Sequence, residues 1–301
     1  MLKFIIFFLS FSFCSLSAQD AFFIADQISS STALERMKDI GLQANLNAAL
    51  KSDRKLQRLI KGKKLAIGLV DLKNPAYAKY ASINGGEMMY AASLPKIAIL
   101  LAAMDAIDKG ELIETAAVTS DMNLMIRKSN NAASTRMIDR VGYKKIAEVM
   151  TSPEYKLYNK EKGGGLWVGK RYAAAGKRNP DPLKGLSHAA SVDAVCKYYY
   201  MLSQGTLVSP ERSEQMKSIL VNPGLHHKFV NTLDKVAPKA KIYRKSGSWR
   251  TFHSDSVWVN GPERNYILVA LINDVEGEQI ARRLVKIAEK AMKNNKVLAS
   301  K

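Results

Sequence analysis

Cysteine is almost absent from this chain, which has only Cys14 and Cys196. Cys14 lies in a segment that is predicted below to be removed, so one thiol remains and no intrachain disulfide can form. Stability must therefore come from a hydrophobic core, for which a chain of 301 residues is long enough. Cys196 shares an i, i+3, i+4, i+7 pattern with Val192, Val195 and Tyr199. This pattern predicts a buried helix position rather than a thiol nucleophile.

Long hydrophobic runs are also lacking. Beyond residue 18, no segment approaches the ~18 consecutive apolar residues that a membrane-spanning helix needs, so no integral membrane segment is predicted after it. The first 18 residues differ, because Lys3 precedes the apolar stretch Phe4–Leu9 and small residues precede Gln19. This pattern is typical of a secretory signal peptide. We therefore expect an exported protein, either periplasmic or secreted.

Acidic residues are few, with 27 Asp and Glu against 46 Lys and Arg. The formal net charge is +19, and loss of Lys3 with the signal peptide lowers it by one. Such a charge favours anionic partners. A solvated basic surface is the simplest interpretation, and attraction to polyanionic envelope material or a carboxylated substrate is the alternative. No nucleic-acid-binding motif accompanies the charge, so nucleic acid is not an expected partner.

Histidine is scarce as well, with four in the chain. His226 and His227 have no third ligand at a metal-binding spacing. His253, Ser254 and Asp255 are consecutive, but neighbours in a strand point to opposite faces and do not assemble a catalytic triad. We therefore expect neither a metal nor a cofactor.

The periodicity of apolar residues divides the chain into two lobes. Helical patterns dominate the middle, and strand patterns occur near both ends, at residues 64–72, 76–83, 240–246, 254–260 and 265–273. The predicted fold class is α/β, more closely an α+β sandwich, with an antiparallel sheet flanked by helices and a separate all-helical lobe. The predicted division is a signal peptide (1–18), a sheet lobe (19–83 and 206–301) and a helical lobe (84–205) with a long loop (152–186). Loops of that length usually carry function.

The first motif with chemical content is Ser-Leu-Pro-Lys at residues 93–96, which opens an apolar helix pattern. Helix geometry places Lys96 one turn from Ser93 on the same face, and the helix N-terminus favours developing negative charge. Burial lowers the pKa of a lysine, as a lysine acting as a base requires. The same Ser-x-x-Lys spacing occurs at Ser52, in a charged stretch. The spacing alone therefore does not distinguish a nucleophile from a helix cap.

Two further motifs follow in order. Ser-Asn-Asn at residues 129–131 lies between two helical patterns and, alone, could be a polar helix junction. Lys-Ser-Gly at residues 245–247 ends an apolar strand, where glycine allows close approach to the backbone. A lysine and a hydroxyl there can bind a substrate carboxylate, and the N–H of Ser248 is placed to donate to an oxyanion.

In this order and context, the three motifs resemble those of the penicillin-recognising serine enzymes, and most closely class A β-lactamases. The resemblance extends from residue 64 to the terminal helix. It implies that Ser93 is the nucleophile, that Lys96 is its base or proton shuttle, and that Ser129 relays a proton to the leaving nitrogen.

The same resemblance assigns the substrate contacts. Asn131 would hold the substrate amide, and Lys245 and Ser246 would bind its carboxylate beside Gly247. The backbone N–H groups of Ser93 and Ser248 would form the oxyanion hole.

The sequence departs from the class A pattern in three places. Asn130 stands where those enzymes carry Asp, and the interval from Ser93 to Ser129, 36 residues, is shorter than theirs. Class A enzymes activate the hydrolytic water with a loop Glu that is followed three residues later by Leu and then Asn. The nearest match is Glu154, with Tyr158 in place of the asparagine. Glu154 is therefore the candidate for deacylation, and a plain surface glutamate is the alternative.

From this resemblance we expect an exported active-site serine hydrolase that forms an acyl-enzyme through Ser93 and hydrolyses β-lactams. One alternative is a D-alanyl-D-alanine carboxypeptidase or related peptidase acting on peptidoglycan stem peptides, whose acyl-enzyme with a β-lactam would persist. The other is a non-catalytic relative that binds the envelope. The expected partner is thus a small-molecule β-lactam or a stem peptide, and the sequence leaves the oligomeric state open.

Overall fold

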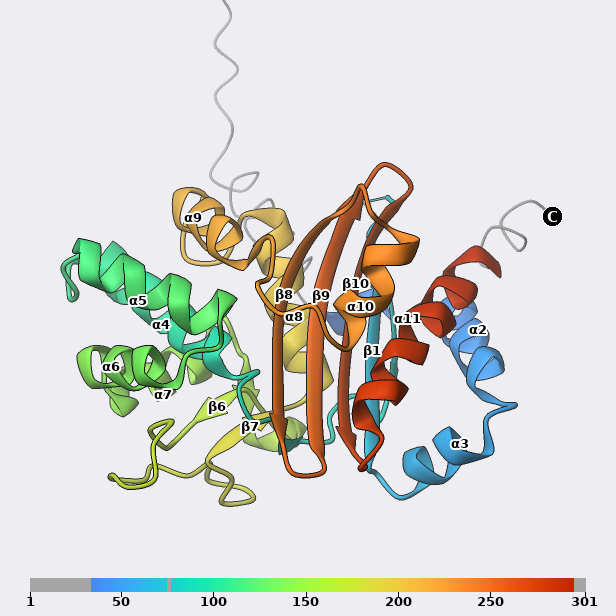
Figure 1. The fold of residues 1–301 in the computed structure, drawn as a ribbon, viewed down its shortest axis with the longest axis horizontal. Helices are drawn as coiled ribbons and strands as arrows, with labels where there is room; N and C mark the ends of the chain where they lie inside the picture. Colours follow the sequence, from blue (N-terminus) through green and yellow to red (C-terminus); the bar gives the residue numbers. More distant parts are fainter. Residues whose placement is uncertain (1–33, 75–76, 295–301) are drawn as a thin grey trace, which may run out of the picture.

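A five-stranded antiparallel sheet forms the centre of the molecule (Figure 1). The structure is a computed structural model that describes residues 34–74 and 77–294, so the predicted signal peptide lies outside the described residues. The strand order is β2-β1-β10-β9-β8, so strands from the two ends of the described chain pair with each other. The strands are β1 (Leu65–Asp71), β2 (Lys79–Ile83), β8 (Lys241–Trp249), β9 (Phe252–Gly261) and β10 (Arg264–Asn273).

One face of this sheet is covered by helices from both ends of the described chain. Their apolar side chains share a buried core with Leu65, Ile67 and Leu69 of β1. Asp39 and Asp53 begin two of these helices, because each carboxylate accepts a backbone N–H from the first turn. The helices are α2 (Ile40–Leu50), α3 (Arg54–Lys61), α10 (Phe229–Val236) and α11 (Gly277–Asn294), and the short η1 (Leu34–Met37) precedes them.

The opposite face of the sheet carries α8 (Val192–Gln204) and, beyond it, the helical lobe (Figure 1). Ala66 and Val70 of β1 belong to this second core, as the two-residue period of a strand requires. Cys196 is buried in α8, which confirms the position predicted from its spacing. The helices of the lobe are α4 (Lys96–Asp108), α5 (Ala116–Arg127), α6 (Asn131–Val141) and α7 (Tyr143–Thr151), and α9 (Pro210–Leu220) packs against α4 and α5.

The helix that follows the first motif, α4, is the centre of the helical lobe. Every residue from Lys96 to Ile107 is buried. A helix that is buried all round must be apolar all round, and residues 96–107 of α4 are so except for Lys96 and Asp105. The amine of Lys96 is therefore carried into the interior.

The long predicted loop, residues 152–186, is organised into short pieces of structure. The buried carboxylate of Asp181 holds its end, accepting N–H groups from Leu183 at 2.9 Å and Lys184 at 3.0 Å and the hydroxyl of Tyr158 at 3.1 Å. Strand β6, within the loop, pairs with β7, and β7 pairs in turn with β3. The three form a small sheet of order β3-β7-β6. The short elements are β3 (Met89–Tyr90), β4 (Tyr158–Asn159), η3 (Lys160–Lys162), β5 (Gly164–Gly165), β6 (Trp167–Val168) and β7 (His188–Ala190).

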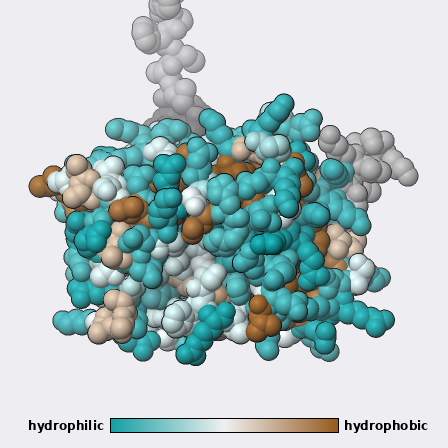
Figure 2. Space-filling model, in the orientation of Figure 1, coloured by the Kyte–Doolittle hydropathy of each residue, from teal (hydrophilic) through white to brown (hydrophobic). Residues whose placement is uncertain are grey.

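The predicted fold class is confirmed, and α10 is the main element that sequence analysis did not find. This helix is short, and it begins after Lys228, whose backbone φ is 54° and whose side chain makes no cap. It therefore lacks the start signal that Ser209 gives to α9. None of the helices in the described ranges is both long and apolar enough to cross a membrane. Figure 2 shows a largely hydrophilic face on which hydrophobic residues form small separate groups.

Candidate active site

Ser93 lies half-buried in the turn that leads into α4. This segment, the Ser93 turn (residues 91–95), is tied to two other elements. The N–H of Ala91 donates to the carbonyl of His188 on β7 at 2.8 Å. The carbonyl of Ala91 accepts from Ser254 Oγ on β9 at 2.7 Å. The Ser93 turn is therefore held where the large sheet meets the helical lobe.

The last part of β8 passes the Ser93 turn at close range. A Cβ at Gly247 would lie 2.5 Å from the backbone nitrogen of Ser93 and 2.4 Å from the carbonyl oxygen of Ala91. Distances this short exclude any side chain, so glycine is required here. Ser248 is the next residue and is exposed. The two residues whose N–H groups are predicted to bind the oxyanion, Ser93 and Ser248, thus both lie beside Gly247.

Lys96 is fully buried and faces the second motif. Its Nζ lies 2.7 Å from the carbonyl oxygen of Ser129, 2.8 Å from Asn131 Oδ1 and 3.3 Å from Ser129 Oγ. Within the described ranges, no carboxylate forms an ion pair with it. Burial lowers the pKa of Lys96 from 10.5 to about 7. A substantial share of Lys96 is therefore a neutral amine at neutral pH.

Lys245 approaches the same serine from β8. Its Nζ donates to Ser129 Oγ at 2.9 Å and to the carbonyl of Ser246 at 2.6 Å. Burial, reinforced by the charge of Lys96, lowers the pKa of Lys245 well below its usual value. A substrate carboxylate beside Lys245 would oppose this shift and favour the charged ammonium.

The contacts of the two lysines define a path for a proton. The carbonyl of Ser129 and the Oδ1 of Asn131 can only accept hydrogen bonds. A neutral Lys96 can direct its two N–H groups to them, which leaves its lone pair available to accept a proton. The hydroxyl of Ser129 accepts a hydrogen bond from Lys245 and lies close enough to Lys96 to exchange a proton with it. The structure thus brings Ser129, Asn131, Lys96 and Lys245 together.

The middle residue of the second motif has a structural task. Asn130 is the N-cap of α6, and its side chain accepts the N–H of Ala133 at 2.8 Å. Asn and Asp cap helices about equally well, so this departure from the class A pattern leaves the start of α6 intact. Ser129 itself has a φ of 53°, a strained conformation for a residue with a Cβ.

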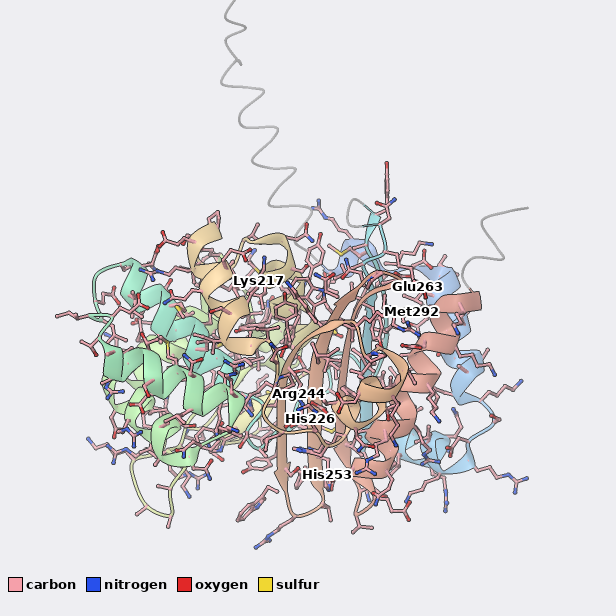
Figure 3. All side chains as sticks on the ribbon, turned by 45° about the horizontal axis from the view of Figure 1, so that its top comes forward. Lys217, His226, Arg244, His253, Glu263 and Met292 are labelled. Atoms are coloured by element: carbon pink, nitrogen blue, oxygen red, sulfur yellow. The ribbon has the colours of Figure 1, made fainter. Side chains whose placement is uncertain are left out.

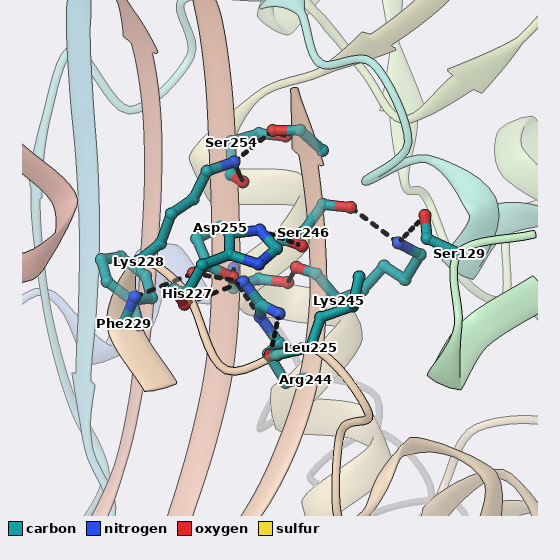
Figure 4. Close-up of polar contacts among 12 residues, drawn as sticks. Ser129, Leu225, His227, Lys228, Phe229, Arg244, Lys245, Ser246, Ser254 and Asp255 are labelled. Atoms are coloured by element: carbon teal, nitrogen blue, oxygen red, sulfur yellow. Dashed lines mark hydrogen bonds and ion pairs between the residues drawn. The ribbon is translucent and has the colours of Figure 1, made fainter. Parts of the chain in front are cut away.

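A second polar cluster lies on the other side of β8 (Figure 4). The guanidinium of Arg244 contacts the carboxylate of Asp255 at 2.7 and 3.0 Å, and both side chains are buried. Lys228 is also buried, and it donates to the carbonyls of Gly247 and Ser254. The loop before α10 passes beside Arg244 (Figure 3) and accepts two of its N–H groups at the carbonyls of Leu225 and His227.

Ser246 belongs to this rear side of the strand. Its hydroxyl lies 3.5 Å from Nε2 of His227, a long contact. Burial and then the charge of Arg244 lower the pKa of His227 to about 4, so this histidine is neutral at neutral pH. The structure places Ser246 next to Lys245 in the chain, but its hydroxyl does not contact Ser129, and its role in carboxylate binding stays a prediction.

Glu154 is not brought to this site. It is exposed, and its charge, with burial as the larger cause, raises the pKa of the adjacent Tyr155. The hydroxyl of Tyr155 donates to Asp105 at 3.3 Å. Asp105 follows Lys96 by nine residues of α4, which is about 13 Å along a helix axis. The structure thus places Glu154 toward the far end of α4, away from Lys96.

Sequence reasoning missed a group of aromatic side chains beside Lys96. The ring of Tyr172, from the long loop, lies 4.4 Å from Nζ of Lys96. The ring of His188 lies against Tyr172, with centroids 4.3 Å apart, and Tyr90 meets His188 edge to face. The long loop was expected to carry function. No pattern in the sequence pointed to Tyr172, which is 76 residues from Lys96.

Comparisons with known proteins identify relatives. A family model described as "Beta-lactamase enzyme family" matches residues 51–123 and 118–294. A comparison with curated protein sequences gave no match.

Solved structures show the same architecture. A β-lactamase from Sphaerobacter thermophilus is 19% identical, with a TM-score of 0.62 over 85% of this chain and 96% of that chain. PBP-A is 20% identical, with a TM-score of 0.61 over 85% and 97%. A β-lactamase from Chitinophaga pinensis is 15% identical, with a TM-score of 0.61 over 79% and 97%. A variant of PBP-A has been solved as an acyl-enzyme complex with penicillin G. At these identities, the likeness establishes the fold.

Proposed function

The chain belongs to the β-lactamase enzyme family and is a serine hydrolase of the β-lactamase type, and we propose that it is exported, forms an acyl-enzyme through Ser93 and hydrolyses β-lactams. The observation that carries this proposal is the hydrogen-bonded series of Lys96, Ser129 and Lys245 beside the Ser93 turn.

In the proposed acylation, the neutral amine of Lys96 takes the proton of Ser93 Oγ. The oxygen then bonds to the β-lactam carbonyl carbon, and the N–H groups of Ser93 and Ser248 hold the oxyanion. When the C–N bond breaks, the ring nitrogen takes a proton from Ser129 Oγ, and Lys96 returns its proton to that oxygen. Both residues end in their starting protonation states, and Ser93 carries the acyl group as an ester.

Lys245 supplies the site for the substrate carboxylate. Its amine is buried and forms no ion pair within residues 34–74 and 77–294. A buried cation without a counter-charge is costly, and a β-lactam or peptide carboxylate beside it would provide that charge. The missing ionic partner of Lys245 thus supports recognition of a substrate carboxylate.

A D-alanyl-D-alanine peptidase is the second candidate, and one observation favours it. No carboxylate of the described residues contacts Lys96, and Glu154 lies elsewhere, so no acidic side chain is at hand to activate water against the ester. A β-lactam adduct on such an enzyme would persist.

One experiment separates the candidates. The purified protein is mixed with penicillin G, and intact mass and β-lactam absorbance are followed together. Turnover supports the β-lactamase, and a lasting mass increase of one penicillin per chain supports the peptidase. Neither an adduct nor turnover would contradict β-lactam recognition and favour the non-catalytic relative.

The chain offers a matched pair of serine variants for this test. Ser93→Ala should abolish the adduct and the turnover, whereas Ser52→Ala, in the second Ser-x-x-Lys segment, should change neither. Export is tested separately, by sequencing the N-terminus of protein recovered from the periplasm and from the medium. A start at Gln19 is expected, and an intact residue 1–18 segment would contradict a cleaved signal peptide.

A further inference from the structure

Tyr172, in the long loop, contacts both the Ser93 turn and Lys96. Its hydroxyl donates to the carbonyl of Ala92 at 3.1 Å, and its ring faces Nζ of Lys96 at 4.4 Å. We propose that Tyr172 is a positioning residue for acylation, which holds the Ser93 turn through Ala92 and shields part of the Lys96 amine from water with its ring. This inference rests on the proposed function.

The contact with Ala92 matters because of its backbone. Ala92 has a φ of 49°, a conformation that costs a residue with a Cβ about 1 kcal/mol or more. Strained positions persist when their surroundings hold them in place. The peptide groups around Ala92 are held by His188 and Ser254 through Ala91, and by Tyr172 through Ala92 itself. Because Ala92 immediately precedes Ser93, its conformation sets the orientation of the peptide group that carries the Ser93 N–H.

The contact with Lys96 completes an enclosure. Three acceptor atoms of Ser129 and Asn131 surround the amine, and the ring of Tyr172 covers another side. The enclosure keeps water from Lys96, and this loss of solvation is the cause of the lowered pKa of Lys96. Without the ring, water reaches the amine and the pKa rises toward its ordinary value.

Two of the groups around Lys96, Tyr172 and His188, keep one protonation state near neutral pH. Burial raises the pKa of Tyr172 well above its usual value, so its hydroxyl retains the proton that it donates. Burial lowers the pKa of His188 to about 4, and its Nε2 must donate to the carbonyl of Lys170 at 3.0 Å, because a carbonyl only accepts. Lys245, from β8, is the other titratable neighbour, and its pKa already lies well below normal. Because the pKa values of Lys96 and Lys245 are both lowered, the NMR titration of Lys96 assigns a change in the pH profile of acylation to one of the two lysines.

Two substitutions separate the contacts of Tyr172. Tyr172→Phe keeps the ring and removes the bond to Ala92, so we expect a fall of about 10-fold in the acylation rate with an unchanged midpoint of the pH profile. Tyr172→Leu removes both contacts. We expect a larger fall and a midpoint moved by about one pH unit to the alkaline side. Tyr143→Phe, which removes a different hydrogen bond to the same loop at Lys177, is the matched control and should change neither.

The test measures acylation by penicillin G, by quenched intact-mass spectrometry from pH 5.5 to 9, together with the titration of Lys96 by NMR of ¹³C-labelled lysine. A wild-type midpoint near 7 that moves in Tyr172→Leu supports the proposal. Wild-type rates and midpoints in both variants overturn it. If Tyr172→Leu does not fold, an unchanged rate in Tyr172→Phe overturns it. If the wild type takes up no penicillin, the proposed function fails, and the NMR titration alone decides the effect of Tyr172 on Lys96.

Discussion

The two faces of β8 carry neighbouring basic residues in opposite electrostatic settings. On the rear face, Arg244 is buried against Asp255, and the pair is surrounded by further hydrogen bonds. On the front face, Lys245 is equally buried but contacts only a hydroxyl and a carbonyl. Successive residues of a strand point to opposite faces. The neighbouring side chains of residues 244 and 245 therefore lie in two different environments, one with a carboxylate partner and one without.

The difference between the two faces indicates which basic residues stabilise the fold and which are available for binding or catalysis. A buried cation with a full set of partners, such as Arg244, holds elements together and has nothing left to bind. A buried lysine without a counter-charge, such as Lys245 or Lys96, loses stability when it is protonated, and a bound anion or a proton transfer can offset that cost. The rear cluster also fixes the front, because Lys228 binds the carbonyl of Gly247, the residue that packs against the Ser93 turn.

The largest expected effect comes from breaking the rear pair. Arg244→Met leaves the carboxylate of Asp255 buried without its partner, and we expect the free energy of unfolding to fall by about 3–5 kcal/mol. Urea denaturation measures it. The double variant Arg244→Met with Asp255→Leu removes both charges and should recover most of the loss. A single variant as stable as the wild type would mean that the rear cluster is not structural.

The front face should respond in the opposite way. Lys245→Met removes a buried amine that has no ionic partner, so the free energy of unfolding should not fall. Acylation by penicillin G should slow by about 10- to 100-fold, since a hydrogen bond to a charged group is worth about 1.5–3 kcal/mol. Lys241→Met, at the exposed start of β8, is the control. The methyl ester of penicillin G sharpens the test, because Lys245→Met should slow the reaction of the ester less than that of the acid; equal slowing of acid and ester would contradict carboxylate binding.

A pH series of stability tests the buried amine of Lys96. Its folded-state pKa of about 7 lies below the unfolded value of 10.5, so the unfolded chain binds more protons between these values, and stability rises with pH across that window. For Lys96 alone, the expected gain from pH 6 to pH 8 is about 1 kcal/mol. The measurement is urea denaturation of the wild type and of Lys96→Met at both values. The variant should lack this part of the gain, and identical slopes would show that Lys96 titrates normally.

The smallest effect is expected at Glu154. Because the side chain is exposed and lies toward the far end of α4, Glu154→Gln should change the lifetime of the penicillin adduct by less than about 2-fold. Intact mass followed over time measures that lifetime. A large increase in adduct lifetime would restore Glu154 as the deacylating base and contradict its placement.

The fold was predictable because its signals are local. The strand patterns, the Ser209 cap before Pro210 and the apolar run of α4 all act within a few residues. The motif residues Lys96, Ser129 and Lys245 also meet as the motif order implied.

The contacts that could not be predicted join residues that are distant in the sequence. Asp255 meets Arg244 and Tyr172 meets Lys96 only after the chain has folded, and neither pair leaves a spacing in the sequence. Glu154 shows the converse, since a partial match to a family pattern gave a residue that the structure places elsewhere.

The most direct test of the central claim is to locate the acyl group on the chain. The protein is treated with penicillin G, quenched in acid and digested with trypsin, and the peptides are fragmented by mass spectrometry. The account predicts one penicilloyl group on the tryptic peptide Tyr80–Lys96, at Ser93. An acyl group on Ser129 or Ser246, or turnover that survives in Ser93→Ala, would contradict it.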